Sequence, residues 1–359
     1  MSQNILIVGA SGYIGGTVLN SLLSSGVLPT ANIRGAVRSD AQADELRNLG
    51  IQAVKITLTD HDAVARAVLD NHIDIVLHTA SSMDFSLAEP LLHALKKRKD
   101  ATSGVTAFAD KAGWTHGLVK ESDDIYDLQR QAAESYVVRE TDTAVARVGE
   151  ELGVFAYIVV PPLVYGNGTG TGNTQSVQIP ILIRAAAAHK QVYQFSEDAV
   201  MFNLYPSHQI TKLTGEQTWP AVHVIDLANY YVSLIRRIVQ QGPLASGKKG
   251  YYLVRSHDVT FHEIAEALGK ELYQRKLVDS PHPATWPSDE VAVKALGLPL
   301  YYTRLAWSST ALVQSERHKD LGWHPEWNHD RFLAEIGESI DPALQAETVA
   351  GSLASLSTS

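Results

Sequence analysis

The chain has 359 residues, of which 45% are hydrophobic and 19% charged, with a formal net charge of -9 and no cysteine. This length suits one large or two small cores, and the missing cysteines exclude disulfides, thiolate catalysis and cysteine zinc sites. The acidic balance argues against nucleic acid as a partner, and no apolar run reaches the ~20 residues that cross a bilayer, so we expect a cytoplasmic protein that binds no membrane.

The first element is an apolar strand at 5–8, which breaks into glycines spaced three apart and continues as a helix at 13–23. Gly9 permits a tight turn, Gly12 lets backbone approach a pyrophosphate, and Gly15 lets the helix pack closely on the sheet. The N-H groups and the dipole at the helix start favour an anion. A glycine triplet in this context predicts a dinucleotide site.

The second strand, at 31–37, bears on which dinucleotide is bound. An NAD site usually places an acidic residue after this strand to accept hydrogen bonds from the ribose. Here Arg38 and Ser39 follow, and a guanidinium beside a hydroxyl suits a 2'-phosphate. Asp40 is close enough to serve a ribose instead. We favour NADP(H) as the cofactor.

Strands and helices then alternate as a doubly wound parallel α/β sheet requires, with a flexible glycine-rich loop at 167–173. We expect further strands at 51–58, 73–79, 105–109 and 155–160, and helices at 62–70, 87–99 and 132–149. Ligands lie beyond the carboxyl ends of such strands. The residues expected to hold the cofactor are Gly9, Ser11, Gly12, Tyr13, Ile14, Gly15, Arg38, Ser39, Leu58, Thr79, Ala80, Ser81, Pro161 and Pro162.

Several motifs together carry a family resemblance: GASGYIGG, the Arg38 strand end, HTAS at strand four, PPLVYG after strand six, AVHVIDLANYY at 221–231 and LGWHPEW at 321–327. The chain resembles an extended short-chain dehydrogenase/reductase of the NAD-dependent epimerase/dehydratase type, nearest the fungal nucleoside-diphosphate-sugar epimerase-like group. His223, within AVHVID, matches a motif that ties the smaller lobe to the sheet.

The resemblance implies a seven-stranded Rossmann sheet and a smaller carboxyl-terminal lobe that binds substrate. The dinucleotide domain would span 1–166 and be completed by about 211–249. The lobe would comprise 167–210 and 250–340, and the tail at 344–359, rich in small polar residues, is expected to be disordered. The family also allows a homodimer.

The catalytic pattern of that family is incomplete in this chain. Such enzymes use a Ser or Thr after strand five and a Tyr-x-x-x-Lys helix, in which Tyr gives a proton and Lys lowers its pKa. Here the Ser-Gly position reads Ala112-Gly113, and the helix at 132–149 has no such pair. The candidate catalytic residues are Tyr136 with Arg139 three residues later on the same helix face, Tyr126 in a displaced position, and Thr115. Each tyrosine can equally be a packed residue.

The last stretch of the chain is rich in aromatic residues with few charges, which suits a hydrophobic or aromatic substrate. A sugar diphosphate would need a cationic clamp, for which Arg184, Lys190 and Lys212 are candidates. The 14 histidines show no metal-binding spacing, so no metal is assigned.

Three functions are compatible with these sequence features. The first is an NADP(H)-dependent reductase of a carbonyl or conjugated double bond. The second is a non-redox isomerase, epimerase or cyclase that binds NADP(H), and the third is a cofactor sensor of the NmrA type. We favour the reductase.

Overall fold

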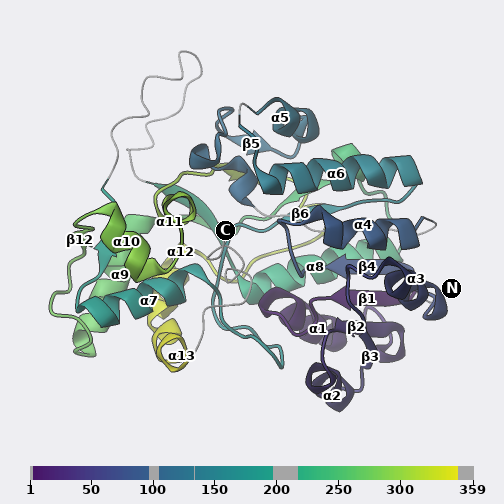
Figure 1. Cartoon of the computed structure of the whole chain (residues 1–359), viewed down its shortest axis with the longest axis horizontal. Coiled ribbons are helices and arrows are strands. Elements are labelled where there is room, and N and C mark those ends of the chain that lie inside the picture. Colours follow the sequence, from purple (N-terminus) through teal and green to yellow (C-terminus); the bar gives the residue numbers. More distant parts are fainter. Residues whose placement is uncertain (1–2, 97–104, 133, 197–216, 347–359) are drawn as a thin grey trace.

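The computed structural model describes residues 3–96, 105–132, 134–196 and 217–346. Its amino-terminal half contains a parallel sheet in the order β3-β2-β1-β4 (Figure 1). The strands are β1 Ile5–Val8, β2 Ile33–Val37, β3 Gln52–Lys55 and β4 Ile75–His78. β1 and β4 are apolar up to His78 and buried throughout, as expected for parallel strands covered on both faces.

Helices cover both faces of this sheet, because successive side chains of a strand point to opposite sides. Ile5 and Ile7 belong to the core that includes buried residues of α1 (Tyr13–Ser25), α2 (Asp40–Asn48) and α8 (Val224–Val239). Leu6 and Val8 belong to the core that includes α3 (His61–Asp70), α4 (Phe85–Ala94) and α6 (Val137–Leu152). The predicted doubly wound α/β fold is therefore confirmed.

The fifth strand that we expected at 105–109 is wrong. Val105–Phe108 is a 3-10 helix (η2), and a second one (η3) follows at Asp110–Ala112. The Arg139 guanidinium donates to the carbonyls of Ala107 and Ala112, and the first of these bonds is 2.8 Å long. These carbonyls are thus bonded to a side chain instead of a neighbouring strand, so the parallel sheet is interrupted here.

The strands of the second half form small ladders. β6 (Ile158–Val160) pairs in parallel with β10 (Tyr251–Leu253). β9 (Thr218–His223) pairs in parallel with β7 (Leu163–Tyr165) and antiparallel with β11 (His257–Thr260). Since β6 is followed by Pro161 and Pro162, the chain leaves the first ladder there and enters the second at Leu163.

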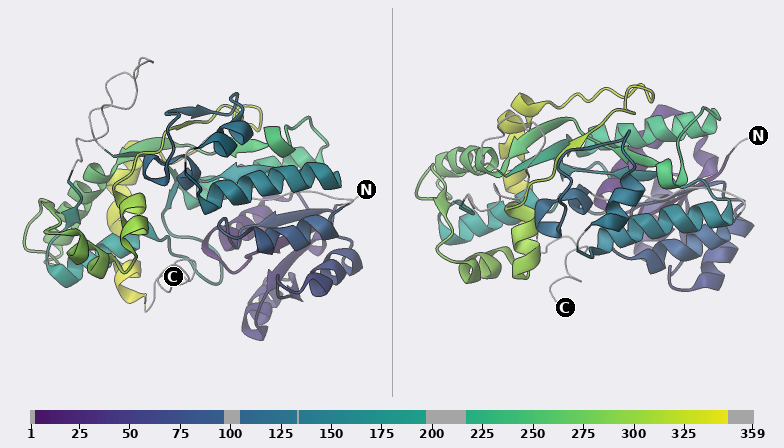
Figure 2. Two further views of the ribbon diagram at one scale, coloured as in Figure 1. Left: turned by 45° about the horizontal axis from the view of Figure 1, so that its top comes forward. Right: turned by 90° about the horizontal axis from the view of Figure 1, so that it is seen from above.

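A smaller lobe packs at the carboxyl edge of the sheets, on the left in Figure 1 and in two further views in Figure 2. Its elements are α7 Gln178–His189, β8 Tyr193–Gln194, α9 Phe261–Gln274, β12 Ala284–Thr285, α10 Asp289–Leu296, α11 Leu300–Trp307, α12 His329–Glu335, η6 Ile336–Ser339 and α13 Ile340–Gln345. The start of the tail expected to be disordered is thus helical at 344–345, and residues 347–359 lie outside the described part. None of the described helices is long and apolar enough to cross a membrane.

The two motifs AVHVID and LGWHPEW meet where the lobe joins the sheets. The His223 ring stacks on Trp327 with centroids 3.9 Å apart and planes at 7°. The Asp226 carboxylate accepts the N-H groups of Glu326 and Trp327 at 3.0 and 2.9 Å, and Trp323 Nε1 donates to the Asp226 carbonyl. The expectation that His223 ties the lobe to the sheet agrees with these contacts.

Candidate functional site

The glycine turn after β1 has the geometry that its spacing predicts. Gly9 has a φ of +91°, and the Gly12 N-H donates to its carbonyl at 2.9 Å. A Cβ on Gly15 would lie 2.2 Å from the Gly9 carbonyl oxygen and 2.5 Å from Thr79 Oγ1. Only hydrogen fits at these positions, so α1 starts in direct contact with the turn and with the end of β4.

The start of α1 fits a dinucleotide pyrophosphate. Gly12 is the N-cap, its position carries no side-chain cap, and the first turn contains no acidic residue. The N-H groups of the first turn are those of Tyr13, Ile14 and Gly15, and Ser11 precedes the N-cap. An uncapped helix start without negative charge favours an anion through N-H groups and helix dipole.

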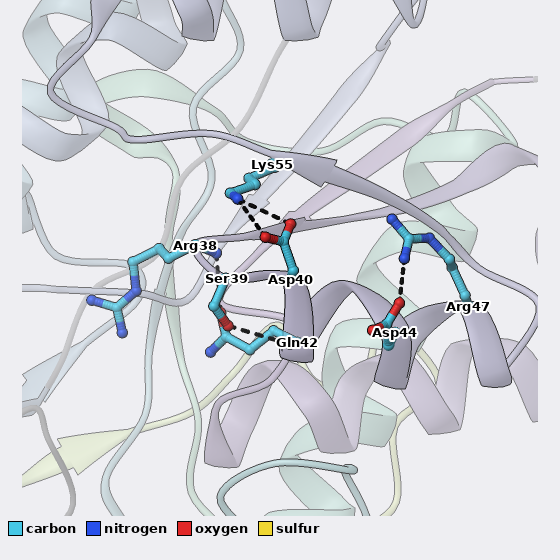
Figure 3. A network of polar contacts seen from close by, with 7 residues as sticks. All are labelled: Arg38, Ser39, Asp40, Gln42, Asp44, Arg47 and Lys55. Carbon is cyan, nitrogen blue, oxygen red and sulfur yellow. Dashed lines mark hydrogen bonds and ion pairs between the residues drawn. The ribbon is translucent and has the colours of Figure 1, made fainter.

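The end of β2 presents cationic groups beside the start of α2 (Figure 3). The Arg38 side chain is exposed and extends away from Asp40. Ser39 is the N-cap of α2 and its Oγ accepts the Gln42 N-H at 3.3 Å. Both Asp40 carboxylate oxygens bind Lys55 Nζ, at 2.9 and 3.0 Å. The acidic group that would serve a ribose is thus paired with a lysine of β3.

Other residues expected to contact the cofactor follow β3 and β4 of the same parallel sheet. Thr79 follows β4, and both its N-H and its Oγ1 donate to the Val8 carbonyl at 2.9 Å. Ala80 is exposed and Ser81 is half-buried behind it. Leu58 is half-buried in the turn between β3 and α3. Thr79 therefore supports the glycine turn with its hydroxyl, which leaves Ala80 and Ser81 as the more accessible members.

Tyr136 and Arg139 are in contact, although they do not share a helix face as we expected. Tyr136 is the extended N-cap of α6, because the predicted helix at 132–149 begins only at Val137, after a break that follows α5 (Ile125–Gln131). The Arg139 guanidinium lies 5.3 Å from the Tyr136 ring centroid. It is buried and also donates to the Glu134 carbonyl at 2.8 Å. With three carbonyls bound, this guanidinium holds the loop rather than a ligand.

The Tyr136 hydroxyl lies in a largely apolar setting near the Thr106 side chain. Burial raises the pKa of Tyr136 to about 12, and only weaker effects of Thr106 and Arg139 oppose it. Val105, the residue before Thr106, donates its N-H to the Pro161 carbonyl at 3.0 Å, and Pro162 follows, buried. The segment that contacts Tyr136 is thus bonded to the chain after β6, and Tyr136 keeps its proton at neutral pH.

The other two catalytic candidates lie elsewhere. Thr115 is exposed, next to Trp114, which is buried against Phe108. Tyr126 lies on α5 with Lys248 Nζ 5.2 Å and the Arg130 guanidinium 5.7 Å from its ring centroid. The Tyr126 ring thus lies where α5 faces the turn at 247–249.

Most aromatic residues of the lobe belong to its own packing. Trp286 stacks on Tyr193 at 4.6 Å, and Trp307 is buried. Tyr301 differs, because it is 45% exposed and contacts Tyr302 edge to face at 5.2 Å. Both tyrosines of α11 are near enough to Tyr136 to affect its pKa.

Of the three residues considered for a cationic clamp on a sugar diphosphate, two lie in the described part of the chain. Arg184 donates to the Ala343 carbonyl at 3.2 Å, and Lys190 ends α7 with a left-handed φ of 56°. Lys212 lies outside the described residues, as do Met201 and Phe202. Within the described part, no group of three or more His, Asp or Glu side chains is placed to hold a metal ion.

Sequence reasoning missed two features. One is a cavity of about 240 Å³ at the ends of β7 and β9, lined by Tyr165, His223, Trp327, Arg331 and Glu335 among others. The other is the glycine-rich loop at 166–174, which packs on α1 instead of extending freely. The alternating glycines of the loop were a visible signal for close backbone contact.

Two curated relatives match nearly the whole chain. One is the uncharacterized protein C2A9.02 of Schizosaccharomyces pombe, 25% identical, with 93% of this chain and 98% of the relative covered. The other is oxidase ucsJ of an Acremonium species, also 25% identical, with 90% and 93% covered. Neither name specifies a substrate.

A solved structure with the same fold is UDP-glucose 4-epimerase of Thermus thermophilus in complex with NAD. The two chains superpose with a TM-score of 0.62 at 16% identity, covering 96% of this chain and 100% of the other. The model of the NAD dependent epimerase/dehydratase family matches residues 5–244, which include the glycine turn, Tyr136 and His223. This chain is a member of the NAD dependent epimerase/dehydratase family.

Proposed function

We propose that this protein is an NADP(H)-dependent reductase that acts on a carbonyl or conjugated double bond of a small hydrophobic or aromatic metabolite. The observation that carries the cofactor preference is the arrangement after β2. Arg38 and Ser39 are available to a 2'-phosphate, whereas Asp40 is paired with Lys55. The Lys55 ammonium competes with ribose hydroxyls for the Asp40 oxygens, whereas a guanidinium binds phosphate oxygens with two hydrogen bonds.

The protonation state of Tyr136 supports reduction as the reaction. NADPH, when bound, would supply the hydride, and this chain would supply the proton. With a pKa of about 12, the Tyr136 hydroxyl stays protonated at neutral pH and can donate a proton to a developing alkoxide. Reduction uses this protonated form, whereas oxidation would need the phenolate.

Two tyrosines of α11 bear on the class of substrate. Tyr301 and Tyr302 present an aromatic surface near Tyr136, and Arg184 is engaged with backbone. Aromatic rings bind apolar or aromatic ligands by stacking and by area buried, whereas a diphosphate needs free cations. These contacts support a hydrophobic or aromatic substrate over a sugar diphosphate.

A second function, non-redox isomerisation, epimerisation or cyclisation, is favoured by Arg139. Its guanidinium is bound to three carbonyls, so it does not reproduce the lysine that lowers the tyrosine pKa in related enzymes. NADPH binding without consumption across a panel of aromatic aldehydes, ketones and enones would select this function.

The test is a fluorescence titration with NADPH and NADH, followed by NADPH absorbance against that panel. Arg38→Ala should weaken NADPH binding by about tenfold or more and leave NADH binding nearly unchanged, because only the 2'-phosphate contact is lost. Arg47→Ala is the matched control, since Arg47 is an exposed cation of α2 paired with Asp44. Equal binding of both cofactors by the unchanged protein would contradict the preference.

A further inference from the structure

The loop at 166–174, here called the strap, has a sequence that alternates glycine with Asn or Thr from Gly166 to Gly172. In extended backbone, alternate residues share a face. A Cβ on Gly168 would lie 2.9 Å from Thr17 Oγ1, one on Gly170 would lie 2.9 Å from the Gly16 Cα, and one on Gly172 would lie 2.2 Å from the Ser11 carbonyl oxygen. Three alternating glycines thus face the same helix start.

Hydrogen bonds hold the strap on this surface along its length. The Tyr13 hydroxyl donates to the Gly166 carbonyl at 2.7 Å, and the Thr169 N-H donates to Thr17 Oγ1 at 3.2 Å. The Asn20 side chain binds the Thr169 carbonyl, and the Asn173 N-H donates to the Ser11 carbonyl at 3.0 Å. Tyr13, Thr17 and Asn20 are spaced along one face of α1. Their hydrogen bonds to the strap form a continuous line of contacts, here called the seam.

Gly16 supports this interpretation from the helix side. The dinucleotide turn accounts for Gly9, Gly12 and Gly15, but it does not require a fourth glycine inside α1. Glycine in a helix interior costs about 1 kcal/mol relative to alanine. A Cβ on Gly16 would lie 3.0 Å from the Gly170 Cα. Gly16 and Gly170 therefore let two backbones approach each other.

The seam also extends across the cofactor site. Ser11 belongs to the turn that faces the pyrophosphate, and it is bound by one end of the strap. Thr171 Oγ1 lies 3.4 Å from Glu45 Oε2 on α2, the helix that starts beside Arg38. Figure 1 shows the strap leaving β7 and passing beside α1 towards α2. Its anchors thus border the pyrophosphate position and the helix beside the expected 2'-phosphate position.

We propose that the strap forms the outer wall of the dinucleotide site and retains NADP(H) between turnovers, so that exchange of the cofactor requires the seam on α1 to open. The proposal rests on the proposed NADP(H) site and adds a control of cofactor release. Residues that act here are positioning residues, because their contacts are to the chain's own backbone.

The test measures the dissociation rate of NADPH by stopped-flow fluorescence, with excess unlabelled NADP+ as the competitor. Gly170→Ala and Gly16→Ala should each raise this rate by about tenfold or more, since each forces the two backbones apart and breaks neighbouring hydrogen bonds. Thr169→Ala is the matched control, because its side chain is exposed and its backbone bonds remain. The control should stay within about twofold of the unchanged protein.

A third variant distinguishes weaker strap contacts from a general loss of stability. Thr17→Val keeps the shape of a buried residue and removes the acceptor of the Thr169 N-H, together with a 2.8 Å bond from the same hydroxyl to the Tyr13 carbonyl of its own helix. It should also raise the rate while thermal unfolding stays close to that of the unchanged protein. Unchanged dissociation rates in all three folded variants would overturn the strap proposal, and slower dissociation or tighter binding would overturn it by showing that the strap obstructs the site. Failure of the unchanged protein to bind NADPH would overturn the proposed function, and the strap proposal with it.

Discussion

Tyr136 shows how one side chain can keep a candidate role while its local structure differs from expectation. Its hydroxyl lies near Thr106, in a site where burial dominates and raises the pKa to about 12. Family members rely on a lysine to lower that pKa, whereas here the backbone-bound Arg139 lowers it only weakly and burial outweighs it. The hydroxyl therefore stays protonated at neutral pH, which is the form that reduction of a carbonyl uses.

The first prediction concerns Tyr136→Phe. Turnover with an accepted carbonyl substrate should fall at least ~100-fold, with NADPH affinity nearly unchanged, because only the proton donor is removed. An equal loss of cofactor affinity would make Tyr136 a structural residue.

The pH profile gives an independent check on the same residue. A group with a pKa of about 12 stays protonated, so the reductase rate should not fall between pH 7 and 9 through loss of this proton. The pKa in the fold exceeds the ordinary value of 10.0, so the stability from this group is fully present below pH 10 and is lost between about 10 and 12. A steep fall in rate near pH 8 that Tyr136→Phe abolishes would contradict this assignment.

Among the elements, α6 and the two 3-10 helices η2 and η3 depend on one buried cation. Arg139 joins Ala107, Ala112 and Glu134 through their carbonyls, so it sets the path of the chain where a fifth strand was expected. Arg139 is only 2% exposed, and this burial lowers the pKa of its guanidinium.

Arg139→Ala should therefore lower the free energy of unfolding by about 3 kcal/mol or more, because it leaves buried carbonyls without donors. Arg139→Lys should recover only part of this, since an ammonium cannot reproduce the planar fork. The control on the same helix is Arg147→Ala, whose side chain is half-exposed and paired with Glu151, with an expected change within about 0.5 kcal/mol. Urea unfolding measures all three, and a small effect of Arg139→Ala would show that the loop holds without it.

Glycines near the two ends of α1 differ in the space around them. Gly15→Ala should abolish cofactor binding and destabilise the fold, because its Cβ would meet the Gly9 carbonyl oxygen at 2.2 Å. Gly26→Asn is the control at the other end, where the C-cap is left-handed at a φ of 62° and no atom lies within 4 Å of a Cβ. Asparagine tolerates this conformation, so binding should persist. Retained NADPH binding in Gly15→Ala would contradict the glycine-turn geometry.

At the scale of the whole molecule, three histidines are buried at points where strands end or the lobe is joined. Burial lowers the pKa of His78, His223 and His257 from 6.5 to about 4 in each case. They are neutral in the fold and charged in the unfolded chain below pH 6.5. Their contribution to stability is therefore present at neutral pH and is lost as the pH falls from 6.5 towards 4.

Urea unfolding between pH 5 and 8 should show this loss, with each histidine contributing at most about 1.4 kcal/mol per pH unit. His78→Leu removes one titrating group and should give a shallower dependence on pH than the unchanged protein. An identical slope would show that His78 is charged or solvated in the fold.

The sequence predicted much of the fold because the signals were local. The alternation of apolar strands and helices gave β1, β2, β4 and β6 and the class of fold, and glycine spacing gave the turn at Gly9. Arg38 could be assigned to the cofactor region because it directly follows a strand, where position in the chain fixes position in the sheet.

By itself the sequence determined the glycine turn, the doubly wound sheet and the cationic end of β2, since each depends on neighbouring residues and on the period of a strand or helix. Only the tertiary structure decided the loss of strand five, the pairing of Asp40 with Lys55, the backbone role of Arg139 and the place of the strap on α1. The contacts behind these features join residues that are far apart in the chain, and such contacts leave little trace in local periodicity.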